Sequence, residues 1–124
     1  MSTTRETVES YWATLEARDW PAFAAVLADD VVYETPQTRE RIRGRDAYVR
    51  FNVEYPGDWH LTPRRILVDG DEAACWVDVR VGDEPMFAIA FIRVAADGRV
   101  REVVDVWPEA YEPPAGREHL VERY

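Results

Sequence analysis

The sequence predicts an α+β fold in which helices pack on one face of a curved antiparallel sheet. Apolar residues recur at helical spacing in the first part of the chain, strand-like stretches dominate after Trp59, and short turn sequences separate these stretches. Helices followed by a run of hairpin-connected strands are typical of the α+β class. With 124 residues, the chain is expected to form one domain, 1–124, in which 109–124 is a C-terminal tail.

The first predicted helix opens with a capping signal. Thr3 and Glu6 form a T-x-x-E box, in which each side chain can bond to the backbone N–H of the other residue. The next apolar residues are spaced i, i+3, i+4 and i+7 and share one helix face: Val8, Tyr11, Trp12 and Leu15. The sequence therefore predicts an amphipathic helix with an aromatic inner stripe.

Two further helices and one short strand are expected next. Asp19 can cap a second helix, which is expected to end near Asp29. The stretch 31–35 is typical of a strand, and the arginine-rich stretch 37–45 is expected to be a polar loop. A third helix is predicted over 46–55, with three aromatic residues on one side: Tyr48, Phe51 and Tyr55.

Four longer strands complete the predicted sheet. The sequences DGD, GDEP and ADGR, which are typical of tight turns, separate them, and their expected ranges are 59–68, 72–81, 86–94 and 99–107. In the second of these strands, alternation places an apolar set on one side and a mixed set on the other. The apolar set is Cys75, Val77, Val79 and Val81, and the mixed set is Trp76, Asp78 and Arg80.

The composition limits the expected partners and compartment. The net charge is −9 and the pI is about 4.7, so neither nucleic acid nor an anionic membrane is an expected partner. The N-terminal stretch lacks the apolar region of a signal peptide, and no stretch reaches the ~18 apolar residues of a membrane helix. Cys75 is the single cysteine, which excludes an internal disulfide and predicts a reducing, cytoplasmic location.

Several classes of chemistry lack their residues in this sequence. All 15 basic residues are arginine, so Schiff-base catalysis by lysine is excluded. The two histidines, His60 and His119, are far apart, and no C-x-x-C or H-x-H spacing occurs, so no metal site is expected. No G-x-G-x-x-G or phosphate-binding loop motif is present, and no cofactor is expected.

One acidic residue stands out in the last predicted strand. Asp105 lies within an apolar run, between Val104 and Val106, where a carboxylate is costly unless it is neutralised, paired or hydrogen-bonded. Alternation puts Asp105 on the same side of the strand as Val103 and Trp107. If that side is the inner one, Asp105 is a buried acid; the alternative is an ordinary strand acid that faces water.

The motifs LADDVVYETP, after the second predicted helix, and IRGRDAY, at the start of the third, resemble the nuclear transport factor 2-like superfamily. The nearest branch is the SnoaL-like polyketide cyclases, with ketosteroid isomerase and limonene epoxide hydrolase as relatives. The resemblance covers roughly 5–110. It implies a cone, in which the curved sheet and three N-terminal helices enclose a pocket, and a homodimer formed through the outer face of the sheet. It identifies the fold better than the reaction, since such folds host many functions.

The resemblance also implies a set of site residues. Asp105 would face the pocket as a general base, His60 would assist it by hydrogen bonding, and Tyr11, or alternatively Tyr33, would donate to a developing oxyanion. A bonded strand-end histidine is the alternative for His60, and core packing is the alternative for Tyr11. The expected substrate-binding residues form a mostly apolar lining that suits a hydrophobic small molecule: Tyr33, Thr35, Tyr48, Phe51, Val77 and Trp107.

Two reactions of the resembled relatives are disfavoured by the residues. Ketosteroid isomerases carry a base at the position of Thr35 and a protonated acid near Ala90, and this sequence has neither. Limonene epoxide hydrolases need an Asp–Arg–Asp set, but alternation turns Asp78 and Arg80 away from the pocket. The leading hypothesis is a cofactor-independent enzyme that acts on a hydrophobic carbonyl compound as a cyclase, isomerase or dehydratase. The alternatives are a non-catalytic ligand-binding protein and a dimerisation domain.

Overall fold

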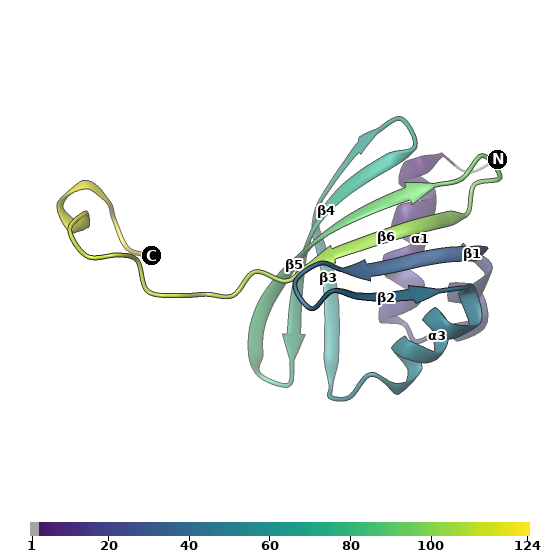
Figure 1. Ribbon diagram of the computed structural model, residues 1–124, viewed down its shortest axis with the longest axis horizontal. Helices are drawn as coiled ribbons and strands as arrows, with labels where there is room; N and C mark the ends of the chain where they lie inside the picture. The colour runs from purple at the N-terminus through teal and green to yellow at the C-terminus, as the bar shows by residue number, and fades with distance from the viewer. Residues whose placement is uncertain (1–2) are drawn as a thin grey trace.

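The structure is a computed structural model that describes residues 3–124, and these residues form three α-helices and one six-stranded sheet (Figure 1). The α-helices are α1 (Thr4–Glu16), α2 (Trp20–Ala25) and α3 (Arg45–Glu54). The strands are β1 (Leu27–Thr35), β2 (Glu40–Arg43), β3 (Trp59–Asp69), β4 (Glu72–Val81), β5 (Glu84–Val94) and β6 (Val100–Val106). A short 3-10 turn, η1 (Glu118–Leu120), lies in the tail.

The sheet has the strand order β2-β1-β6-β5-β4-β3. Four of the neighbouring pairs are antiparallel, and β1 pairs with β6 in parallel. The predicted α+β class and the curved sheet packed against three helices are confirmed (Figure 1). The parallel pair was not predicted, because it joins two segments about 70 residues apart that no local pattern connects.

Three predictions for the stretch between α1 and α3 are wrong: the end of the second helix, the start of the strand predicted at 31–35, and the loop at 37–45. The second helix ends at Ala25 instead of near Asp29, because the chain enters β1 at Leu27, whose partner in the sheet is Val100. The backbone N–H of Val100 also donates to the carbonyl oxygen of Val26, at 2.8 Å. Strand β2 occupies part of the stretch 37–45 that was expected to be a loop; it lies at the edge of the sheet, where charged side chains are typical.

The capping box of α1 forms as predicted. The Thr3 hydroxyl accepts from the Glu6 backbone N–H at 3.1 Å, and the Thr3 N–H donates to the Glu6 carboxylate at 3.2 Å. The apolar stripe of this helix is buried and includes Val8, Tyr11, Trp12 and Leu15. Helix α1 packs across β3, β4, β5 and β6, while α3 packs against β1 and β2.

Strand alternation separates an inner and an outer face of the sheet. On β4, Cys75, Val77 and Val79 are buried, whereas Asp78 and Arg80 are exposed. The inner side chains of β5 and β6 join them in the core: Ala88, Ala90, Ile92 and Val103. Beyond β6, residues 109–124 run away from the sheet and the helices as an extended arm (Figure 1). Within the described residues, the helices are too short or too polar to span a bilayer.

Candidate active site

The inner face of the sheet and the helices α1 and α3 enclose a cavity of about 790 Å³, a size that suits a small-molecule site. Its floor includes Val77, Val79 and Ala88, from β4 and β5. Its walls are rich in aromatic side chains, namely Tyr11, Trp12, Tyr33, Tyr48, Phe51, Tyr55, Trp59 and Trp107. The lining is therefore mostly apolar, and the few polar groups within it are the ones that can take part in catalysis or in specific binding.

Asp105 is the buried acid of this cavity. It lies on β6 opposite Ala90 of β5, and only 8% of its surface is exposed. Its Oδ2 accepts a hydrogen bond from the Tyr33 hydroxyl at 2.7 Å, whereas its Oδ1 is buried and has no hydrogen-bond partner among residues 3–124. Burial raises the pKa of Asp105 from the ordinary 3.8 to about 6, although the bond from Tyr33 opposes the rise.

Three tyrosines from three elements surround this acid. The hydroxyl groups of Tyr11 on α1 and Tyr48 on α3 are hydrogen-bonded to each other. The rings of Tyr33 and Tyr48 stack with their centroids 4.7 Å apart. Burial, reinforced by the negative charge of Asp105, raises the pKa of all three phenols, so each keeps its proton at neutral pH.

The Tyr11–Tyr48 pair has two O–H groups, and the hydrogen bond between the two residues uses only one of them. Each phenol can donate one hydrogen bond, and the bond between the two oxygens requires only one of the two O–H groups. The second O–H group has no other acceptor among the side-chain hydrogen bonds of residues 3–124, and both residues line the cavity. The site thus combines an acceptor, the Oδ1 of Asp105, with a donor on a different wall.

All six residues expected to bind the substrate line the cavity: Tyr33, Thr35, Tyr48, Phe51, Val77 and Trp107. The sequence did not point to the polar residues near them, Gln37, Thr38, Asn52 and Glu109, because they come from a predicted loop, a helix and the tail. Arg41 also contributes to the lining, and its guanidinium pairs with Glu34 at 3.0 Å. Within 39–45, it is the arginine that reaches the cavity.

His60 lies outside the cavity lining, and the structure does not form the His60–Asp105 pair that the family resemblance implied. Its ring nitrogens bond to Glu16 and Asp58, each at 2.9 Å. The hydrogen bond to Glu16 is the main reason that the pKa of His60 is raised. The reason for its position is strand alternation: the neighbours Trp59 and Leu61 face the cavity, so His60 faces the other side.

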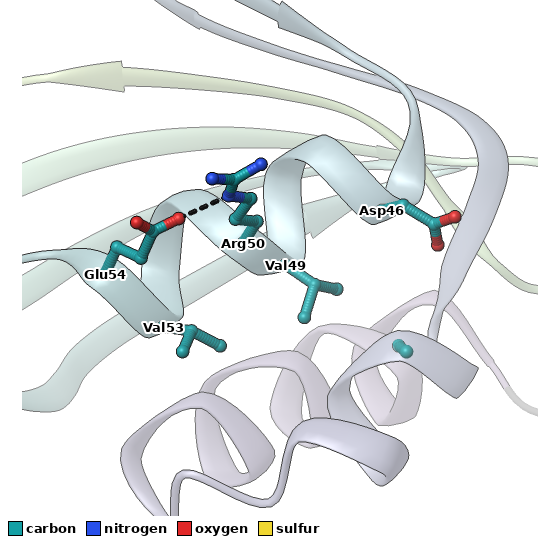
Figure 2. Close-up of a pocket in the computed structure, with 6 residues that line it drawn as sticks. Asp46, Val49, Arg50, Val53 and Glu54 are labelled. Carbon is teal, nitrogen blue, oxygen red and sulfur yellow. Dashed lines mark hydrogen bonds and ion pairs between the residues drawn. The ribbon is translucent and has the colours of Figure 1, made fainter.

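A second hollow, of about 570 Å³, lies on the surface between α2 and α3 (Figure 2). Val49 and Val53 point from α3 toward the neighbouring helices, and Arg50 pairs with Glu54 along the outside of α3 (Figure 2). Its charged side chains, including Asp46, are exposed to solvent. This hollow therefore lacks the buried ionisable group that distinguishes the larger cavity. Among residues 3–124, no three side chains of the His, Cys, Asp or Glu types are grouped to hold a metal ion.

Comparison with known families shows which family the chain belongs to. A model of the SnoaL-like domain matches residues 8–103, and the chain therefore belongs to the SnoaL-like domain family. Its fold is that of the nuclear transport factor 2-like proteins, as the resemblance predicted. No curated protein matches the sequence.

Several solved structures are similar. A protein from Kribbella flavida DSM 17836, described as a "putative ketosteroid isomerase", is 57% identical, with 98% of this chain and 89% of that chain covered and a TM-score of 0.95. A nuclear transport factor 2-like protein of unknown function from Burkholderia xenovorans LB400 is 23% identical, with 98% of this chain and 94% of that chain covered and a TM-score of 0.83. A "putative polyketide cyclase" from Sinorhizobium meliloti is 22% identical, with 84% of this chain and 99% of that chain covered and a TM-score of 0.72.

Proposed function

We propose that the chain is an acid/base enzyme that removes a proton next to the carbonyl group of a hydrophobic small molecule, with Asp105 as the base. The observation that carries this proposal is the unpartnered, buried Oδ1 of Asp105 in an apolar cavity. A carboxylate with a pKa of about 6 is ionised at neutral pH and is a stronger base than an exposed aspartate. No cofactor is required for this chemistry.

Each polar group of the site has a role in the proposed reaction. The Oδ1 of Asp105 takes the proton, the C–H bond breaks, and its electron pair moves toward the carbonyl oxygen. The free O–H of the Tyr11–Tyr48 pair donates to that oxygen as it becomes negative. Tyr33 holds the other carboxylate oxygen in place. The proton on Asp105 then goes to another carbon of the enolate (isomerase), to the oxygen of a second carbonyl group that the enolate carbon attacks (cyclase), or to a hydroxyl group that leaves as water (dehydratase).

The 57% identity to the protein described as a "putative ketosteroid isomerase" favours a second candidate. In this candidate, Asp105 is protonated and donates to the carbonyl oxygen beside Tyr11, as a neutral carboxylic acid does in ketosteroid isomerase. Its raised pKa is compatible with that role. The base would then have to come from elsewhere, since Thr35 holds the position where the isomerases have theirs, and for this reason we place this candidate second.

Hydrogen–deuterium exchange tests the proposal without knowledge of the natural substrate. Proton NMR in D2O would follow exchange next to the carbonyl group of cyclohexanone, 1-tetralone and a 3-oxosteroid. We expect catalysed exchange for at least one ketone and a loss of about 100-fold or more in Asp105→Asn, the usual contribution of a general base. The control is Asp78→Asn, which removes an exposed acid from the outer face of the same sheet.

The pH dependence of the exchange rate distinguishes the two candidate functions, in which Asp105 is the base or the acid. If Asp105 is the base, the exchange rate rises with pH through about 6, because the carboxylate is the active form. If it is the acid, the rate falls over the same range. Thermal stabilisation by a ketone without any exchange would instead support a ligand-binding protein without catalysis.

We also propose that the chain forms a homodimer through the outer face of the sheet. Phe91 of β5 is 51% exposed there, and its half-buried neighbours extend an apolar surface over β4, β5 and β6: Trp76, Phe87, Ile89, Val104 and Val106. Exposed apolar patches of this kind commonly mark protein interfaces. Sedimentation velocity should give a mass of about two chains, and Phe91→Ser should shift it toward one chain.

A further inference from the structure

We infer that the extended arm, residues 109–124, packs on a second copy of this chain and acts as a clasp between subunits. This goes beyond the proposed reaction, because it concerns a segment that lies outside the cavity except at its first residue, Glu109. It rests on the proposed contact between outer sheet faces and goes beyond it, because it assigns a second contact to the dimer.

Among residues 3–124, the arm beyond Glu109 makes no hydrogen bond to the rest of the chain. The hydrogen bonds of residues 110–124 join the arm to itself: Arg123 bonds to Glu112 at 3.4 Å, and the backbone N–H of Gly116 donates to the Glu118 carboxylate at 3.0 Å. The 3-10 turn η1 packs against none of the helices or strands in the described part of the chain. Figure 1 shows the arm running clear of the sheet before it folds back on itself as a hook.

The arm nevertheless has the side chains of an interface. Tyr111 is 85% exposed and Leu120 is 73% exposed, and Val121 and Tyr124 are exposed as well. Large apolar and aromatic side chains are the common anchors of protein contacts, and they are costly to leave in water. Pro113 and Pro114 stiffen the extended part of the arm, which reduces the entropy lost when the arm is held against a surface.

The structural match to a solved relative extends into the arm. Residues 1–108 make up 108 of the 124 residues, about 87% of the chain. The match to the Kribbella flavida structure covers 98% of the chain with a TM-score of 0.95, so it extends over most of the arm.

A second copy of the chain is the occupant that the topology favours. Strand β6 lies inside the sheet, between β1 and β5, and the arm is its direct continuation. The outward side chains Val104 and Val106 are therefore continuous both with the apolar outer face and with the root of the arm. Two copies that meet on this face bring each arm beside the body of the other copy.

The test uses full-length variants whose changes lie only in the arm. Tyr111→Ser combined with Leu120→Ser removes two exposed anchors, and Glu122→Ser is the matched control in the same arm. Sedimentation velocity over a dilution series measures the dimer dissociation constant, and trypsin cleavage after Arg117 reports the exposure of the arm. We expect the double variant to raise the dissociation constant tenfold or more and to accelerate cleavage, and we expect the control to match the wild type.

The possible results separate this inference from the other proposals. Because Tyr111 and Leu120 are largely exposed and η1 packs against no helix or strand of residues 3–124, the secondary structure and ketone exchange of the double variant should be unchanged. If Phe91→Ser dissociates the dimer but the double variant dimerises as the wild type does, the clasp is refuted and the contact between outer faces stands. If the wild-type chain is a monomer whose arm is cleaved at once, the clasp is also refuted.

Discussion

Replacing Asp105 with asparagine should stabilise the protein at neutral pH while it removes the proposed base. The pKa of Asp105 is about 6 in the folded chain and about 3.8 for an ordinary aspartate, an interval of about two pH units. At about 1.4 kcal/mol per unit, the ionised carboxylate lowers the free energy of unfolding by about 3 kcal/mol above pH 6. The asparagine oxygen can still accept the bond from Tyr33, but its amide N–H groups meet no partner, which costs about 1–2 kcal/mol. The expected net gain is about 1–2 kcal/mol.

The direction of the pH dependence follows from proton binding. Between pH 4 and 6 the folded chain holds a proton on Asp105 that the unfolded chain has lost, so this group makes the folded chain less stable as the pH rises. The Asp105→Asn variant has no titrating group at this position, so it does not lose stability in this way as the pH rises. Urea denaturation of the variant and the wild type, from pH 4 to pH 8, should show a difference that grows with pH and levels off above about 6. A variant that is less stable than the wild type at pH 8, or a difference that does not vary with pH, would refute the reasoning.

Three further predictions concern the groups around the site. Tyr33→Phe should raise the pKa of Asp105 by about one to two units in a carbon-13 NMR titration, because it removes a hydrogen bond to the carboxylate; an unchanged value would contradict the contact. His60→Gln should flatten the fall in stability that the wild type shows as the pH rises above about 6.5, since the Glu16 contact raises the pKa of His60, and it should leave ketone exchange unchanged. Ala88→Leu should weaken binding of the 3-oxosteroid tenfold or more by calorimetry, and cyclohexanone much less, because it fills part of the cavity floor.

Local sequence signals predicted the elements that depend on local interactions. The Thr3–Glu6 box and the apolar stripe behind it define α1 without help from the rest of the chain. The end of α2 and the start of β1 depend instead on pairing between Leu27 and Val100, which are 73 residues apart. The charged strand β2 forms because it can pair with the edge of β1, and its own sequence has no apolar alternation.

The same distinction applies to the site. Alternation within β6 was sufficient to group Asp105 with Val103 and Trp107, although it could not tell which side of the sheet was the inner one. The bond between Tyr33 and Asp105 joins residues 72 apart, so only the assembled sheet reveals it. His60 shows the opposite case: the alternation of its own strand could have indicated an outward position, because its neighbours Trp59 and Leu61 are the apolar ones.

The titration of the Asp105 carboxyl group by carbon-13 NMR, with the signal assigned by its absence in Asp105→Asn, tests the central claim most directly. A pKa near 6 that changes when a ketone binds would agree with a buried acid that faces the guest in the cavity. A pKa near 3.8, unaffected by any ketone, would mean that water solvates this carboxylate, and it would contradict the proposed chemistry.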